Sequence, residues 1–152
     1  MVFAYLEYAF GTKKYTHIID PDCEIPEDGV AQARQAFDRM ASGEPLQYVT
    51  GEAYFYGRRF NVTPAVLIPR PETEILCQRV LSESGAGRGS KILDLCTGSG
   101  CIAWTLALEL PGAEVAAVDI SEDALGVASG QDFSEEISRT ESRKPHFIKA
   151  DV

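Results

Sequence analysis

The stretch KILDLCTGSGCIA, residues 91–103, decides the fold of this chain. It starts with an apolar run that predicts a strand over residues 91–95, passes through a loop of small residues, and enters an apolar helix predicted over 102–110. A second apolar run, residues 114–119, ends in the acid Asp119. Strand, glycine loop, helix, strand and terminal acid, in this order, predict half of a parallel sheet that binds a nucleoside.

The spacing of small residues in the loop distinguishes between two kinds of nucleotide ligand. A dinucleotide fingerprint would need glycine at positions 96, 98 and 101, where this chain has Cys96, Gly98 and Cys101. The alternative spacing, acid-x-small-x-Gly-x-Gly, is met by Asp94, Cys96, Gly98 and Gly100 and is the pattern of S-adenosylmethionine sites. That ligand has no phosphate and does not need the third glycine. The loop therefore predicts S-adenosylmethionine as cofactor, and a turn that merely needs small residues is the alternative.

Acids at the ends of the predicted strands are the candidate ligand contacts. Asp119 can accept hydrogen bonds from both ribose hydroxyls, each worth about 1.5–3 kcal/mol, or it can serve as a helix-capping acid near Ser121. Asp94 is expected near the amino group of the ligand, or else bonded to local amides. Asp151 ends a third strand predicted over 146–150, which places it at the ligand rim or in solvent.

The composition is that of an ordinary globular protein, with 152 residues, 45% hydrophobic and 24% charged. The net charge of −9 gives no counterion release on nucleic acid, so no direct nucleic-acid partner is expected. No apolar run reaches membrane-spanning length, and no signal peptide is recognisable. The four cysteines form no CxxC pair and no histidine stands at metal-ligand spacing from them. We therefore expect a reducing, cytoplasmic location, no membrane contact and no metal site.

The N-terminal part of the sequence predicts helices followed by a hairpin. Residues 2–10 predict a helix ended by Gly11, and a longer helix begins at Pro26. The apolar face of the longer helix follows three- and four-residue steps and consists of Val30, Ala33, Phe37, Met40 and Ala41. Residues 52–63 alternate around Gly57 and predict a β-hairpin.

Two more helices flank the predicted sheet. Pro71 suits the first turn of the one that precedes it. Its buried face is expected to consist of Ile75, Leu76, Val80 and Leu81. Downstream, Ser121 is predicted to cap a helix that runs through Ala128 and past Phe133. The polar stretch 134–145 is expected to be exposed.

Two segments together resemble one protein family. GEPLQYVTGEAYFYGRRFNVTPAVLIPRPETE, residues 43–74, followed by KILDLCTGSGCIA, is similar to the HemK/PrmC-type methyltransferases. Members of this family methylate the glutamine of the GGQ motif in class 1 peptide chain release factors, so these factors are the implied partners. The resemblance implies an incomplete helical domain over 1–46 and a β-hairpin linker over 47–70. It also implies the first half of an α/β, Rossmann-like S-adenosylmethionine-dependent methyltransferase sheet over 71–152.

The resemblance also assigns cofactor contacts by position. The loop around S-adenosylmethionine would consist of Cys96, Thr97, Gly98, Ser99 and Gly100. Asp119 would hold the ribose, and Asp151 and Val152 would lie beside the adenine. The segment from Pro69 to Thr73 would border the cofactor and substrate pocket, which makes Arg70 and Thr73 candidate contacts, or it is a rigid hinge between domains.

The sequence departs from the family pattern in ways that bear on function. Relatives usually have glycine where Cys96 stands, and a Cβ at positive φ costs about 1 kcal/mol. The family carries N-P-P-Y after its fourth strand to orient the substrate amide, and residues 1–152 contain no such motif. We therefore assign no catalytic residue within this sequence and expect it to be inactive alone. The edge of an unfinished sheet is also expected to promote self-association.

Two alternatives stay open at this point. DNA adenine-amino methylases share the nucleoside loop and N-P-P-Y, although the acidic charge and the PRPETE segment argue against them. A non-catalytic module that binds a release factor through its helical part is the other.

Overall fold

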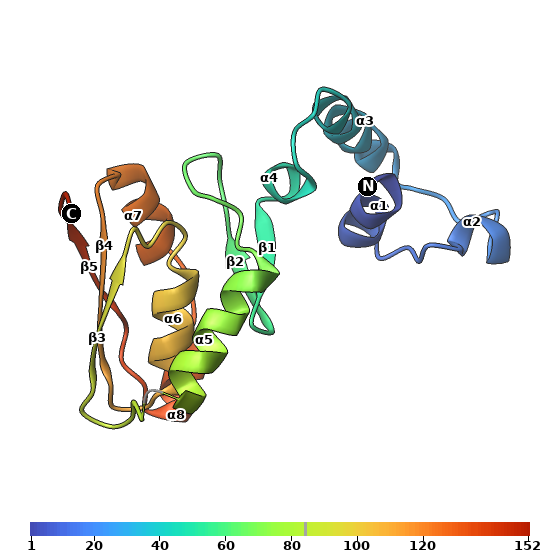
Figure 1. Ribbon diagram of the computed structural model, residues 1–152. Coiled ribbons are helices and arrows are strands. Elements are labelled where there is room, and N and C mark those ends of the chain that lie inside the picture. The colour runs from blue at the N-terminus through green and yellow to red at the C-terminus, as the bar shows by residue number, and fades with distance from the viewer. Residues whose placement is uncertain (84) are drawn as a thin grey trace. The chain divides into compact units, whose positions relative to one another are not determined.

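The computed structural model describes residues 1–83 and 85–152, and the chain divides into two compact units, Met1–Gly51 and Glu52–Val152 (Figure 1). The first unit contains helices only. They are α1 (Val2–Phe10), α2 (Thr16–Ile19), α3 (Glu27–Ala41) and α4 (Leu46–Thr50). The first and third of these were predicted from the sequence, whereas the two short ones were not.

One stripe of α3 forms the centre of the first unit. Its buried residues Gly29, Ala33, Ala36 and Met40 follow one another at four- and three-residue steps. The predicted face was wrong at its two ends, because Val30 is 41% exposed and Ala41 is also exposed. Each of these two lies one position beside the stripe, which turns it about 100° away from the core.

Phe10 of α1 packs closely against α3 at Gly29. A Cβ there would lie 2.5 Å from the Phe10 ring, so the contact requires glycine. Tyr5 completes this small core, and α1 ends as predicted at Gly11, which has φ +65° and donates its N–H to the Glu7 carbonyl.

The second unit has a hairpin followed by alternating helices and strands. The hairpin is β1 (Glu52–Phe55) and β2 (Arg58–Asn61), paired antiparallel. After it come α5 (Pro71–Glu83), β3 (Lys91–Leu95), α6 (Cys101–Glu109), β4 (Glu114–Asp119), α7 (Glu122–Ser129), α8 (Ser134–Thr140) and β5 (His146–Lys149). The last three strands form a parallel sheet in the order β3-β4-β5, which confirms the predicted α/β fold.

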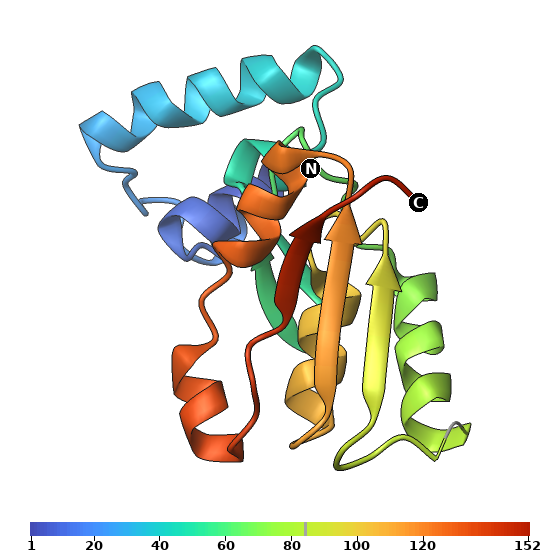
Figure 2. The ribbon, with the colours of Figure 1, turned by 90° about the vertical axis from the view of Figure 1, so that its left-hand side faces the viewer.

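The helices α5 and α6 lie on one side of this sheet, as Figures 1 and 2 show. Ala103 and Ala107 of α6 pack against Val115 and Ala117 of β4, and these four side chains are buried. Small side chains on both surfaces let the helix approach the sheet closely.

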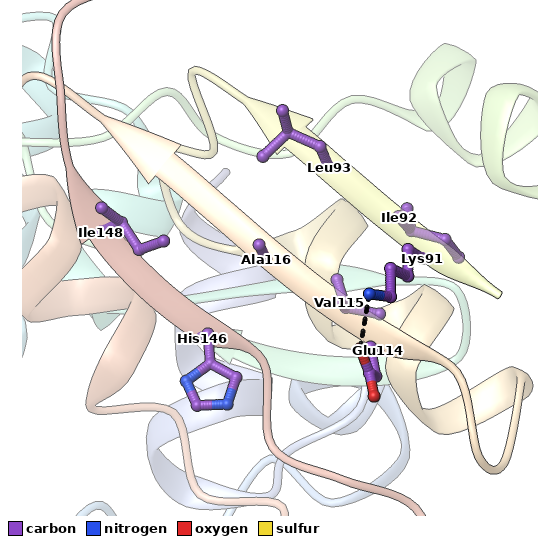
Figure 3. Close-up of a pocket in the computed structure, with 8 residues that line it drawn as sticks. All are labelled: Lys91, Ile92, Leu93, Glu114, Val115, Ala116, His146 and Ile148. Atoms are coloured by element: carbon purple, nitrogen blue, oxygen red, sulfur yellow. Dashed lines mark ion pairs between the residues drawn. The ribbon is translucent and has the colours of Figure 1, made fainter. Parts of the chain in front are cut away.

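The opposite side of the sheet is open. Leu93, Leu95 and Ile148 are 58%, 51% and 48% exposed there. A shallow hollow of about 400 Å³ on this surface is lined by residues of all three strands. Lys91 and Glu114 form an ion pair of 3.9 Å at one end of it, and Figure 3 shows the lining residues. Parallel sheets are usually covered on both faces, so an exposed apolar face such as this one is unusual.

The hairpin belongs to the core of the second unit. Phe55 and Phe60 are 1% and 0% exposed and join Trp104 of α6 in the main hydrophobic cluster. At the turn, the Tyr56 N–H donates to Glu74 Oε1 of α5 over 2.9 Å. Arg58 pairs with Glu109 and Glu136 and so reaches α6 and α8. The structure therefore groups the hairpin, from Glu52 on, with the sheet, and groups α4 with the N-terminal helices.

Two sequence predictions about the helices of this unit were wrong in part. Ile75 and Leu76 are 55% and 52% exposed, and Cys77 is the fully buried residue of α5. The cause is that α5 packs on α6 through a narrow stripe only, in which Cys77 is followed by the half-buried Val80 and Leu81.

None of the helices among the described residues is both long and apolar enough to cross a membrane.

The second correction concerns the chain after β4. α7 ends at Ser129, before Phe133, and α8 forms within the polar stretch that was expected to be merely exposed. Phe133 packs between the rings of Phe60 and Trp104, with centroid distances of 5.1 Å to each. That aromatic contact fixes the chain between the two helices.

Candidate cofactor-binding site

The loop between β3 and α6 has an unusual backbone conformation. Cys96, Gly98 and Gly100 have φ of +58°, +55° and +79°, a region that side chains with a Cβ rarely adopt. A Cβ on Gly100 would also lie 3.0 Å from both Ala128 and Trp104. A Cβ on Gly98 would meet no atom within 4 Å, so the space beside this residue is open. The loop thus has one glycine packed against side chains of α6 and α7 and one that faces open space.

Hydrogen bonds tie the loop to the carboxyl ends of both neighbouring strands. The Thr97 N–H donates to the Val118 carbonyl over 2.9 Å, and its hydroxyl donates to Asp94 Oδ2 over 2.7 Å. The Gly98 N–H donates to Asp119 Oδ2 over 2.9 Å. These contacts hold the loop in a defined shape without a ligand.

Asp94 is a buried acid, only 7% exposed. Burial raises the pKa of its carboxyl, the hydrogen bond from Thr97 partly offsets this, and the nearby charge of Asp119 raises the pKa further. Two carboxyl groups therefore lie close together at the end of the sheet. A positively charged group bound beside them would be stabilised by both.

Asp119 keeps part of its capacity to accept hydrogen bonds. Its Oδ2 accepts from Gly98, and its Oδ1 accepts from the Ser121 N–H over 3.0 Å. A carboxylate has about four acceptor positions, so about two remain. The cap of α7 is supplied by Ser121, whose Oγ accepts from the Ala124 N–H over 3.2 Å, as predicted. Asp119 is thus half-buried, oriented by two backbone donors, and able to accept from a diol.

The other candidate residues lie at different distances from this centre. Ser99 is buried within the loop, at 2% exposure. Asp151 and Val152 follow β5 and are exposed, and the Ala150 N–H donates to the Asp119 carbonyl, which brings this end of the chain to the same edge of the sheet. Arg70 is exposed and Thr73 half-buried at the start of α5, and their contact with a cofactor stays a prediction.

One buried residue beside the loop was missed by the sequence analysis. Gln131 lies between α7 and α8, is 5% exposed, and bonds to the Ser99 carbonyl. Its neighbours Gly130 and Asp132 gave the segment the look of an ordinary polar turn, and no local pattern distinguishes it. Only the folded structure brings it against the loop.

The residues present fit an adenosyl ligand with a positively charged end. The open space at Gly98 admits a ligand close to the backbone, and the remaining acceptor positions of Asp119 match a ribose diol. Asp94 and Asp119 supply negative charge at the same place. A pyrophosphate would be repelled by this pair of acids.

Comparison with known proteins gives related sequences over nearly the whole chain. Residues 3–51 match the PrmC N-terminal domain. A release factor glutamine methyltransferase of Koribacter versatilis is 52% identical over 71% of this chain and 39% of its own length. The one of Chlorobaculum tepidum is 38% identical over 97% of this chain and 50% of its own length.

Similarity to solved structures is partial. A SAM-dependent methyltransferase from Aquifex aeolicus matches 49% of this chain and 38% of its own, at 24% identity and a TM-score of 0.37. The chain spans half or less of the length of the two sequence relatives named above. On these matches the chain is similar in sequence to release factor glutamine methyltransferases, and its residues 3–51 match the PrmC N-terminal domain.

Proposed function

We propose that this chain binds S-adenosylmethionine as part of an enzyme that methylates the side-chain amide nitrogen of a release-factor glutamine. One observation carries the proposal. In a chain that is 52% identical to a release factor glutamine methyltransferase, the loop from Cys96 to Gly100 is hydrogen-bonded to Asp119, which can accept further hydrogen bonds. Class 1 release factors, with glutamine in their GGQ motif, are the proposed substrates.

The cofactor supplies a methyl group on a positively charged sulfur, which makes the sulfur a good leaving group. Asp119 orients the cofactor by accepting hydrogen bonds from its ribose. The loop from Cys96 to Gly100 supports the methionine portion, and Asp94 stabilises its amino group. Asp151 and Val152 are proposed to contact the adenine, and Arg70 and Thr73 to border the pocket. All these groups act by binding and orientation, which is the main contribution available in a methyl transfer.

The substrate amide makes the greater chemical demand. An amide nitrogen is a weak nucleophile because its lone pair is delocalised, so it must be held in line with the methyl group. The N-P-P-Y motif that the family uses for this does not occur in residues 1–152. We therefore propose that these residues bind cofactor weakly and do not turn over by themselves.

A methyl-transfer assay tests the proposal. Labelled S-adenosylmethionine is incubated with a class 1 release factor or with an adenine-containing DNA duplex. The protein is either this chain alone or this chain joined to a segment that carries N-P-P-Y. Label in the release-factor glutamine with the joined protein only is the expected result. Label in DNA would favour the adenine-methylase alternative. Turnover by the chain alone would contradict the proposal that the N-P-P-Y motif is needed to orient the substrate amide.

Binding of a release factor by a chain that has no affinity for S-adenosylmethionine would favour the second alternative, a non-catalytic module.

We also propose that the protein is located in the reducing cytoplasm, where its proposed substrate acts. All four cysteines are free thiols in the structure, which agrees with this location. No direct contact with nucleic acid is proposed, since the net charge is −9.

Self-association is proposed to occur through the sheet. β3 is an edge strand, and the open side beside it exposes Leu93 and Ile148. Sedimentation of the unaltered chain and of Leu93→Lys should show association that the lysine reduces. Sedimentation of the unaltered chain as a monomer at every concentration would contradict this proposal.

A further inference from the structure

The side chain of Gln131 joins two segments that are far apart in the sequence. Its Oε1 accepts from the Asn61 N–H over 2.8 Å, and its Nε2 donates to the Asn61 carbonyl over 2.8 Å. The same Nε2 donates to the Ser99 carbonyl over 3.2 Å. Asn61 is the last residue of the hairpin strand β2, and Ser99 lies in the cofactor loop. Gln131 therefore connects the hairpin to the loop directly.

The chemistry of the amide matches these partners. A glutamine side chain has two N–H donors and one oxygen, and here both donors and the oxygen are used. The orientation of the amide is fixed by its partners, because a backbone N–H can only donate and a carbonyl can only accept. The side chain is 5% exposed, so water cannot readily replace a lost bond. Neither glutamate nor an apolar side chain can make the same three bonds.

The contact with Ser99 lies at a sensitive point of the loop. The preceding residue, Gly98, donates its N–H to Asp119, and the following one, Gly100, is the N-cap of α6. The short loop is thus held by Asp119 at the peptide group between residues 97 and 98 and by Gln131 at the one between residues 99 and 100. Loss of the bond to Ser99 would leave its peptide group held through the Gly100 N–H, which donates to the Thr97 carbonyl over 2.9 Å. We therefore expect the loop, including the Gly98 N–H, to fluctuate more when the Gln131 bond is lost.

We propose that Gln131 is a positioning residue, which holds the cofactor loop in its binding shape by fixing it to the end of the hairpin. It contacts no cofactor itself. The proposal depends on the proposed function only in so far as the loop binds S-adenosylmethionine. The hairpin thereby has a role in cofactor binding, because the Asn61 backbone orients the Gln131 side-chain amide, and this amide in turn holds the loop at Ser99.

The test replaces Gln131 by glutamate, which has nearly the same shape and keeps the acceptor but lacks both donors. Gln131→Leu provides a second variant without charge. Gln78→Glu is the matched control, since Gln78 is exposed on α5 of the same unit. Amide hydrogen exchange is followed by NMR at Gly98 and Gly100 of the loop and at Ala117 of the central strand. Affinity for S-adenosylhomocysteine is measured by titration of the same samples.

In both Gln131 variants we expect exchange at Gly98 and Gly100 to accelerate at least about tenfold, while Ala117 is unchanged. The dissociation constant for S-adenosylhomocysteine should rise about tenfold in parallel, and the control should match the unaltered chain. Unchanged loop exchange would overturn the proposal, and so would equal acceleration at Ala117, which would indicate a merely structural role. If the unaltered chain binds no S-adenosylhomocysteine, the proposed function fails, and loop exchange still decides the role of Gln131.

Discussion

Replacement of Cys96 by glycine should stabilise the second unit. Cys96 has φ +58° and is exposed, so its Cβ is strained and its thiol contributes little burial. Relief of this strain is worth about 1–2 kcal/mol. The greater freedom of glycine in the unfolded chain costs about 0.4–1 kcal/mol. The free energy of unfolding should therefore rise by roughly 0.5–1 kcal/mol, which raises the melting temperature by about 2–6 °C for a unit of this size.

Thermal and denaturant unfolding, followed by circular dichroism, measure this change. Cys96→Ala is the essential control, because it removes the thiol but keeps the Cβ, and it should give no gain. Glu141→Gly should gain a similar amount, since Glu141 is exposed with φ +55°. Cys23→Gly should gain nothing, because Cys23 is an exposed thiol without a positive φ. Equal stability of the alanine and glycine variants at position 96 would refute the argument from backbone strain.

Other substitutions test the loop and its surroundings. Gly100→Ala should destabilise by about 2 kcal/mol or more and Gly98→Ala by about 1 kcal/mol in urea unfolding, because only the first adds a clash to the strain of positive φ. Arg58→Met should cost about 1–3 kcal/mol at neutral pH. The pairing with Arg58 holds the Glu136 pKa below its usual value, so this cost should persist above the ordinary glutamate range and shrink as the pH falls through the lowered pKa. Asp94→Asn should be more stable than the unaltered chain at neutral pH but not in acid, because burial raises the Asp94 pKa and penalises only its charged form. The same variant should bind S-adenosylhomocysteine more weakly, and unchanged affinity by calorimetry would contradict the role given to Asp94.

The elements around the cofactor loop could be predicted because local chemistry determines them. The apolar runs of β3 and β4, the glycine at position 98 and the cap at Ser121 each depend on residues close in sequence. The hairpin turn at Gly57 is another local signal, with φ +74°. These patterns were sufficient to locate Asp94 and Asp119 at the same end of the sheet.

The features that were missed depend on contacts between distant segments. Cys77 rather than Ile75 is the buried residue of α5 because α6 offers only a narrow surface to it. α8 forms in a stretch of ordinary polar composition, where Glu136 pairs with Arg58 of the hairpin. Gln131 carries no sequence signal at all, since its role arises only when residues 61, 99 and 131 meet. Periodicity and composition do not predict such contacts between residues that are far apart in the sequence.

Titration of this chain with S-adenosylhomocysteine, followed by the NMR amide signals of Gly98 and Gly100, tests the cofactor site most directly. Asp119→Asn removes the charge that is proposed to hold the ribose, and Asp123→Asn makes the same change at an exposed position of α7. We predict saturable shifts of both glycine signals, about tenfold or more weaker binding by Asp119→Asn, and unaltered binding by Asp123→Asn. Equal binding by the Asp119 and Asp123 variants, or no shift at either glycine, would contradict the account.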